Sequence, residues 1–436
     1  MKLLSTALTG FNIAVLTCVF AETSVAQSLA IENIAIYDVA SGEVRADQTI
    51  LVLNGVISQV GARSAITISD DATVIVGDGL TVLPGLTDAH VHMNEIDAGT
   101  FLANGVTSVR ELNGSEQHLQ LRDDIAKGNI LGPRMLVSSP LLSGRSIQFR
   151  HVLLETPAQA TQMVDDLHSA GYDYLKVYDD LSPDTYDQLV ASANNAGMRM
   201  VGHIPSAVGL QRVLSAGQSI EHNEKIIADT LNADYSDVTP LRGVAELISR
   251  SGVTVTPTLA VHEFLSARQS KEVQDRLSSP EMSYVDDDIV NWWRATFPRP
   301  DEFSGPQQGP LNFLNAQRFL LAEMEQLGVP ILAGTDTPNP LLVAGFSLHD
   351  ELNALVRGGL TNEAAIRAAT SVPGTHMPWG VRLGQVRVGY VADLVLVRGN
   401  PAEDPSILRA PVGVVANGQW LDRNQLDELL AAARRE

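Results

Sequence analysis

Two histidines one residue apart are the strongest candidate for a chemical site in this sequence. They end the segment 83–92, which reads LPGLTDAHVH. On a β-strand, residues i and i+2 point to the same face, so His90 and His92 would aim their imidazoles into one space. Imidazole is the commonest metal ligand near neutral pH, and two ligands of one metal must meet in this way. The pair alone is equally consistent with two structural histidines.

Later segments place further potential ligands at or near the ends of short apolar runs. They are Lys176 in YLKVY at 174–178, His203 after VG at 201–202, His222 after IE at 220–221, and Asp336 after AGT at 333–335. Each motif alone is weak, because a lone histidine such as His203 or His222 is more often structural. Together, in this order on separate strands, they indicate a metal site.

The elements that must position these residues alternate along the chain. Eight apolar runs have strand character and include residues 86–92, 106–109, 134–137, 174–178, 199–203, 219–222, 253–259 and 330–333. Helical patterns lie between them, for example at 157–170, 183–196 and 207–216. This alternation predicts an α/β fold, a (β/α)8 TIM-type barrel over residues 83–379. Such barrels carry their chemistry at the C-terminal ends of the strands, where the candidate ligands lie.

The two ends of the chain differ from the barrel region. Strands are expected at 31–37 and 48–53, followed by the hairpin signal Asn54-Gly55, and again at 392–397 and 412–416, followed by Asn417-Gly418. We therefore expect a small β-domain from residues 27–82 and 380–436, with a helix only near 425–435. The stretch 234–317 is too long for one barrel unit. We expect a lid insertion around 262–315, with an exposed linker as the alternative.

Lys176 is unusual because lysine is almost never buried without a partner, yet it lies in an apolar strand. One interpretation is a lysine that extends to solvent or meets an internal carboxylate. The other is chemical. Burial near cations lowers the pKa of a lysine, and a neutral amine can react with carbon dioxide to give a carbamate. That reaction turns a cation into an anionic oxygen ligand able to bridge two metals.

This pattern resembles the amidohydrolase superfamily, and more closely its imidazolonepropionase-like and metal-dependent prolidase-like branch. The resemblance covers nearly all of the chain after its N-terminal segment. The motifs that carry it are LPGLTDAHVH at 83–92, the Lys176 strand, ILAGTD at 331–336, LHDEL at 348–352, AIRAAT at 365–370 and GYVADLVL at 389–396. In that family the two chain ends form a small β-sandwich beside the barrel, which agrees with the β-rich ends of this chain.

The resemblance implies a binuclear metal site. By motif, His90, His92 and Asp336 would hold the first metal, His203 and His222 the second, and N-carboxylated Lys176 would bridge them. Zinc suits this set of imidazole and oxygen ligands, and manganese, cobalt and iron remain alternatives. The metals would activate a bridging water and polarise the scissile carbonyl. Asp336 would take the proton of that water and pass it to the leaving nitrogen.

Four other polar residues have open roles. Arg110 follows a strand and could bind a substrate carboxylate, or form an ion pair with Glu111 or Asp88. Tyr178 shares a strand face with Lys176 and could donate to the oxyanion, or simply pack in the core. His262 and His349 fall outside the ligand pattern and are expected to be structural, with a substrate role as the alternative.

Composition restricts partners and location. The 436 residues are 44% hydrophobic with a net charge of −21, which argues against nucleic acid and anionic membranes as partners. Residues 1–26 resemble a secretory signal, with Lys2, an apolar run and SVA before the expected cleavage after Ala26. A buried first helix or a membrane anchor is the alternative. We expect a periplasmic or secreted protein whose single cysteine, Cys18, leaves with the signal; a homo-oligomer is an open possibility.

The sequence thus predicts a secreted, binuclear metal-dependent hydrolase of an amide-type C–N bond. A dipeptide of the Xaa-Pro kind or an N-acyl amino acid is the expected substrate class. A cyclic amide, lactone or carbamate hydrolase with the same site is the enzymatic alternative. A deaminase fits less well, because that branch typically lacks the lysine on the fourth strand. A metal-free, non-catalytic scaffold is the alternative from another class.

Overall fold

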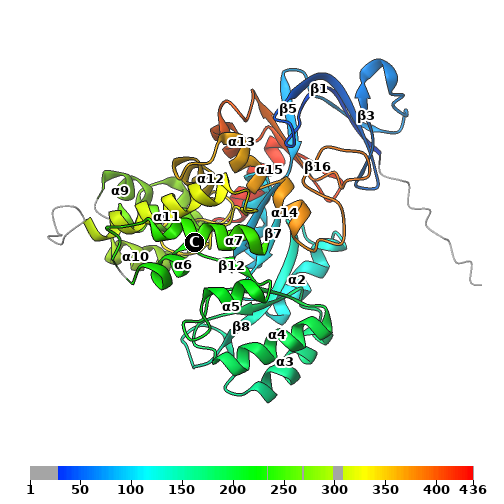
Figure 1. Cartoon of the computed structure of the whole chain (residues 1–436). Coiled ribbons are helices and arrows are strands. Elements are labelled where there is room, and N and C mark those ends of the chain that lie inside the picture. The colour runs from blue at the N-terminus through cyan, green and yellow to red at the C-terminus, as the bar shows by residue number, and fades with distance from the viewer. Residues whose placement is uncertain (1–27, 233, 268–269, 298–307, 436) are drawn as a thin grey trace, which may run out of the picture.

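The computed structural model describes residues 28–232, 234–267, 270–297 and 308–435. The expected signal segment 1–26, with Cys18, lies outside these residues. Figure 1 shows a barrel region surrounded by helices, and a separate sheet that contains β1, β3 and β5 at one end of the molecule. Among the described helices, none combines the length and the apolar character needed to cross a membrane.

The barrel is built on a parallel sheet whose strand order is β13-β12-β11-β10-β8-β7-β6, with β9 paired to β8. Its strands are β6 (Leu86–Val91), β7 (Val106–Glu111), β8 (Arg134–Ser143), β9 (His151–Leu153), β10 (Tyr174–Val177), β11 (Arg199–Gly202), β12 (Ser219–Glu221) and β13 (Val255–Thr256). Every residue of β6, β7 and β10 is buried, as expected for parallel strands covered on both faces.

The predicted eighth strand is irregular but lies where the barrel needs it. The segment 330–337 pairs with β13 through a parallel bridge between Val255 and Ile331, and with β6 through another between Val91 and Thr337. The backbone N–H of Asp336 also donates to the carbonyl of His90 at 2.8 Å. This segment therefore joins the two ends of the sheet, and the predicted TIM-type barrel is confirmed.

Helices follow most of the strands and cover the barrel. They are α1 (Ala98–Ala103), α2 (Glu116–Ala126), α3 (Pro157–Ala170), α4 (Pro183–Ala196), α5 (Leu210–Ser215), α6 (Asn223–Leu231), α7 (Pro240–Ser251), α11 (Gln308–Gln326), α12 (Ser347–Arg357), α13 (Asn362–Ala368) and α14 (Ser371–His376). Two predicted helices, α3 and α4, have the expected bounds, because each begins with proline after a hydroxyl residue and ends at a left-handed glycine. The helix expected at 207–216 is shorter, since it begins only after Gly209, whose φ of 75° is not helical.

Both chain ends contribute to the second sheet, which confirms the expected β-rich unit beside the barrel. Its strand order is β16-β15-β14-β5-β1-β2-β3, and β4 pairs with β1. The strands are β1 (Ser28–Tyr37), β2 (Val44–Leu53), β3 (Val56–Ala62), β4 (Thr73–Val76), β5 (Leu80–Pro84), β14 (Leu394–Arg398), β15 (Gly413–Ala416) and β16 (Gln419–Asp422). The Asn54-Gly55 and Asn417-Gly418 pairs make the predicted hairpins, with positive φ at all four residues. The C-terminal helix is α15 (Arg423–Ala432).

The region in which we expected a lid is helical where it is described. It contains α8 (Leu259–Ser266), α9 (Lys271–Leu277) and α10 (Asp287–Thr296). Figure 1 shows α9 and α10 on one side of the molecule. Trp293 of α10 is fully buried in a small apolar cluster with Val273, Met282 and Leu341. The insertion thus has a core of its own, and Leu341 links that core to the loop after Asp336.

Candidate metal centre

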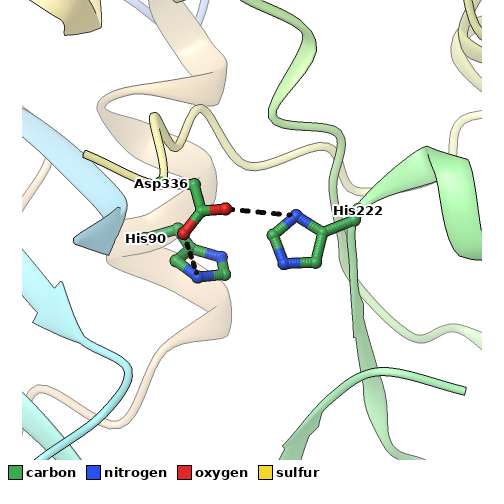
Figure 2. Close-up of side chains that lie close together, drawn as sticks. All are labelled: His90, His222 and Asp336. Atoms are coloured by element: carbon green, nitrogen blue, oxygen red, sulfur yellow. Dashed lines mark ion pairs between the residues drawn. The ribbon is translucent and has the colours of Figure 1, made fainter. Parts of the chain in front are cut away.

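The carboxylate of Asp336 lies at the centre of a group of histidines. Its Oδ1 atom is 3.2 Å from Nε2 of His90 and 3.0 Å from Nε2 of His92. Its Oδ2 atom is 3.9 Å from Nδ1 of His222. Figure 2 shows Asp336 between the rings of His90 and His222. Potential ligand atoms of these three residues lie within 4.8 Å of one another, a spacing that one metal ion can span.

The barrel brings these residues together at one end. His90 lies on β6, His92 follows it, and His222 follows β12. His203 follows β11, and its ring centroid is 4.9 Å from that of His222. All of these residues line one pocket of about 580 Å³, together with Asp336, Lys176 and Tyr178. Every sequence-predicted ligand therefore reaches the same space.

Three of the four candidate histidines are held through Nδ1 by an oxygen atom of a residue outside the predicted ligand set. The pairs are His90 with Glu221 at 2.7 Å, His203 with Asp179 at 3.2 Å and His222 with Thr258 at 2.8 Å. Carboxylates only accept hydrogen bonds, and the Thr258 hydroxyl already donates to the carbonyl of Pro257. The Nδ1–H groups of these three histidines must therefore donate, which leaves their Nε2 lone pairs for a metal. His92 differs, because its Nδ1 lies 3.7 Å from Glu111, beyond hydrogen-bond distance.

Arg110 does not reach the pocket, where an arginine that binds substrate would have to lie. It is 1% exposed, and its guanidinium donates to Glu221 at 2.6 Å, to the carbonyl of Ala89 at 2.7 Å and to Thr256 at 3.2 Å. It is also absent from the lining of the pocket. The expected contact with a substrate carboxylate therefore has no basis in this position. The structural ion pair that the sequence allowed does form, but with Glu221 instead of Glu111 or Asp88.

The side chain of Asp88 fixes the loop that carries Asp336. This buried carboxylate accepts from the backbone N–H and the hydroxyl of Thr335, at 3.0 and 2.8 Å. Gly334 allows the loop to approach β6, since a Cβ there would lie 2.9 Å from the backbone nitrogen of His90. Asp336 itself has a φ of 63°, and His222 one of 73°. Such backbone strain persists only where the surroundings enforce it, and it is common at functional sites.

Lys176 is the most unusual member of the site. It is 1% exposed, and its Nζ atom has no hydrogen-bond partner among the described residues. Burial lowers the pKa of its ammonium to about 8, although the nearby charges of Glu221 and Asp336 favour the cation. At mildly alkaline pH a substantial fraction of Lys176 is therefore the neutral amine. An unpartnered amine inside a cluster of ligands is what a group that becomes a metal-bridging carbamate requires.

The electrostatics of the site also suit a cation. Burial alone would raise the pKa of Asp336, but the surrounding imidazoles of His90, His222 and His92 hold it well below its usual range. Burial lowers the pKa of His203 to about 4 and that of His222 well below its usual value. Burial disfavours the charged form of His92 too, yet the nearby carboxylates of Asp336 and Glu111 raise its pKa to about 9. The residues present thus combine an ionised carboxylate with two neutral imidazoles, which fits a divalent metal.

The remaining predicted residues are placed as follows. Tyr178 lines the pocket, with its ring centroid 4.4 Å from that of His203. His349 is buried away from the pocket, where it bonds the carbonyl of Asn104. His262, which we expected to be structural, does line the pocket and pairs with Glu224 at 2.8 Å. No spacing signal marks His262 in the sequence, because it follows no barrel strand directly.

Sequence reasoning missed the oxygen partners of the histidines. Glu221 could have been found, because it is an acidic residue within an otherwise apolar strand, next to the candidate ligand His222. Asp88, which holds the loop of Asp336, has the same signal on the strand of His90. Asp179 follows the Lys176 strand, and Thr258 directly precedes α8, so neither has such a signal.

Comparison with known proteins identifies relatives over most of the chain. Residues 81–421 match the sequence profile of the Amidohydrolase family. Ochratoxinase of Aspergillus niger is 25% identical over 236 residues, which cover 53% of this chain and 39% of that protein. The bottromycin amidohydrolase structure superposes with a TM-score of 0.75 at 26% identity and covers 93% of this chain and 90% of its own. The structure of an Xaa-Pro dipeptidase with methionine bound in its active site superposes with a TM-score of 0.68 at 22% identity. The match covers 91% of this chain and 100% of that one.

Proposed function

The chain belongs to the amidohydrolase family, and from this premise we propose that it is a binuclear metal-dependent hydrolase that cleaves an amide-type C–N bond. The substrate class is a dipeptide of the Xaa-Pro kind or an N-acyl amino acid. One observation carries the proposal. Oδ1 of Asp336 lies within 3.2 Å of Nε2 of both His90 and His92, in a pocket that Lys176, whose Nζ atom has no hydrogen-bond partner among the described residues, also lines.

The proposed ligands divide into two sets. His90, His92 and Asp336 would hold one metal, His203 and His222 would hold the other, and N-carboxylated Lys176 would supply oxygen ligands to both. The Nδ1 hydrogen bonds of His90, His203 and His222 support their roles as ligands, because they leave Nε2 of each imidazole as the free ligand atom. Zinc ions bound there supply Lewis acidity, which lowers the pKa of water and polarises a carbonyl.

Asp336 carries the proton in this proposal. Its pKa well below the usual range keeps the carboxylate ionised at neutral pH. It takes a proton from water at a carboxylate oxygen while the water oxygen bonds the carbonyl carbon. When the C–N bond breaks, the same proton passes from Asp336 to the leaving nitrogen. Asp336 ends the turnover ionised, and the products are a carboxylic acid and an amine.

Tyr178 is proposed to stabilise the negative oxygen that develops on the carbonyl. Burial raises the pKa of its phenol, and the charge of Asp179 raises it further. The hydroxyl therefore remains protonated across the working pH range and can donate a hydrogen bond. Its position in the pocket beside His203 places it within the same small space as the proposed ligands.

The N-terminal segment supports a proposal about location. We propose that residues 1–26 direct export and are removed, so that the mature enzyme works in the periplasm or outside the cell. Mass spectrometry of the protein from intact cells should find a chain that begins at Gln27. A mature chain that retains Met1–Ala26 would contradict export with cleavage.

The test of the function is a chelation and substrate experiment. Purified full chain is screened against Xaa-Pro dipeptides, N-acyl amino acids and lactones, before and after treatment with a chelator. We expect hydrolysis of an amide class, its loss on chelation, and its return with added zinc. Asp336→Asn is the matched control, since it preserves the shape of the site. Full activity in metal-free protein would refute the proposal, and a preference for lactones would redirect it to C–O bonds.

A further inference from the structure

Besides the proposed metal ligands, the pocket is lined by side chains of two chemical kinds. Leu141, Val261, Leu265, Pro338 and Pro340 form an apolar wall, whereas the polar side chains of the lining are Asn113, Gln148, Glu224, Lys225, His262 and Asn339. The apolar wall takes no part in the proposed metal-dependent chemistry, so it is available to bind an apolar part of a substrate.

Two aromatic side chains complete the apolar wall. Phe149 and Trp292 are 52% and 58% exposed, and both line this pocket. Among the described large hydrophobic residues that are exposed, they are the only aromatic ones. Aromatic rings offer the largest apolar contact area of any side chain, and leaving them in water is unfavourable. That both lie at this one pocket indicates an apolar occupant.

The rings come from segments far apart in the sequence. Phe149 lies in the loop between β8 and β9, after one barrel strand. Trp292 lies on α10 of the insertion, where its neighbour Trp293 is fully buried in the cluster with Met282 and Val273. Trp293 therefore anchors the helix in the core of the insertion, which leaves Trp292 on the pocket side. The insertion thus supplies a large apolar contact to a site whose chemistry lies in the barrel.

We propose that Phe149 and Trp292 form an apolar subsite that selects amides with a large hydrophobic group, preferably aromatic, beside the scissile bond. This inference rests on the proposed amide hydrolysis and specifies its substrate class. Neither ring touches the reacting atoms in this account, so both are specificity-determining residues. Burial of an aromatic group of the substrate against these rings should raise kcat/KM about tenfold or more relative to a substrate with a methyl group there.

The test compares three amides that share one type of scissile bond. N-acetyl-L-alanine has no large apolar group, N-(3-phenylpropanoyl)-L-alanine has one on the acyl side, and N-acetyl-L-phenylalanine has one on the amine side. We expect kcat/KM of the wild type to be at least about tenfold higher for one phenyl compound than for N-acetyl-L-alanine. The better phenyl compound also identifies the side of the bond that the subsite binds.

Variants then assign the preference to the two rings. Trp292→Ala and Phe149→Ala should each lose most of the preference for the phenyl compound, through a higher KM for that compound with kcat little changed. Trp292→Phe should retain the preference, since an aromatic ring remains. The matched control is Leu327→Ala, because Leu327 is 41% exposed and outside the pocket. Equal kcat/KM for all three amides, or a preference that survives in both alanine variants, would overturn the inference.

A binding measurement separates this inference from the proposed function. The intact amides are titrated into Asp336→Asn by calorimetry, with Asp336→Asn/Trp292→Ala as comparison. If the wild type hydrolyses none of the three, the proposed function fails for this class, and binding alone decides the inference. Tighter binding of a phenyl compound that depends on Trp292 supports the subsite. Equal binding of all three compounds refutes it.

Discussion

Glu221 is the residue whose replacement tests the architecture of the site most deeply. Its carboxylate is 0% exposed and accepts hydrogen bonds from Arg110 at 2.6 Å and from His90 at 2.7 Å. Glu221→Gln keeps the shape but removes the charge, which leaves the guanidinium of Arg110 buried without its counter-ion. Breaking a buried pair in this way costs about 3–5 kcal/mol. Since the amide oxygen still accepts one hydrogen bond, we expect a loss near the lower end of that range.

The same substitution should weaken metal binding. Glu221 holds Nδ1 of His90 and increases the basicity of the ring, so its loss should reduce metal affinity by about 10–100-fold. Unfolding of the metal-free full chain in urea measures the stability, and zinc titration against a competing chelator measures the affinity. Both effects are expected in the same variant, because one carboxylate serves both partners.

The control for Glu221→Gln is Glu246→Gln on α7. Glu246 pairs with Arg250 at 2.8 Å, but their side chains are 53% and 73% exposed. An exposed pair contributes less than about 1 kcal/mol, and this one is remote from the metal ligands. If Glu221→Gln loses no more stability than this control and binds zinc as tightly as the wild type, the assigned role of Glu221 is wrong.

Three further predictions follow from the site. Asp336→Asn should lose at least ~100-fold in kcat with metals still bound, by kinetics and elemental analysis; near-normal kcat would assign the proton to another group. Burial lowers the pKa of His203 from 6.5 to about 4, so the neutral imidazole contributes fully to the free energy of unfolding of the metal-free protein above pH 6.5. That contribution, up to about 3 kcal/mol, should be lost as the pH drops to 4. Urea unfolding of His203→Asn should show a smaller loss of stability over this pH range, and the same pH profile in the variant and the wild type would contradict the prediction. Gly334→Ala should press on His90 and cost about 1–3 kcal/mol with weaker zinc binding, whereas Gly243→Ala, which has open space around it, should not; equal effects would refute the packing argument.

The fold was largely predictable because its signals are local. The bounds of α3 and α4 follow from proline at one end and glycine at the other, and both Asn-Gly hairpins form where the sequence predicts them. The eighth strand was harder. Its residues pair with β13 and β6 through single bridges, because the chain turns at Asp336 to present its carboxylate. No local pattern encodes that irregularity.

The candidate ligands were predictable because each lies near the C-terminal end of a barrel strand or directly after it, where side chains must converge. Their support was not predictable, because it depends on residues distant in the sequence. The bond between His90 and Glu221 joins positions 131 residues apart. Arg110 shows the same difficulty. A structural ion pair was one of its two predicted roles, but its partner could not be predicted, because Glu221 lies on a strand that only the closed barrel brings beside Arg110.

The contribution of the insertion also escaped sequence reasoning. The Trp292-Trp293 pair gave no indication of which ring would enter the core of the insertion and which would face the pocket. That choice depends on how α10 packs against the segments before it, which bury Trp293 with Val273 and Met282.

The number of zinc ions that one chain binds decides whether the site is binuclear. Full chain is loaded with zinc, freed of unbound ions and measured by elemental analysis, beside Lys176→Ala treated in the same way. We predict two ions per wild-type chain and a loss of metal in Lys176→Ala, partly restored by a short carboxylate such as acetate, which supplies the missing oxygens. A wild type that binds no zinc, or a Lys176→Ala variant that keeps two ions per chain, would contradict the account.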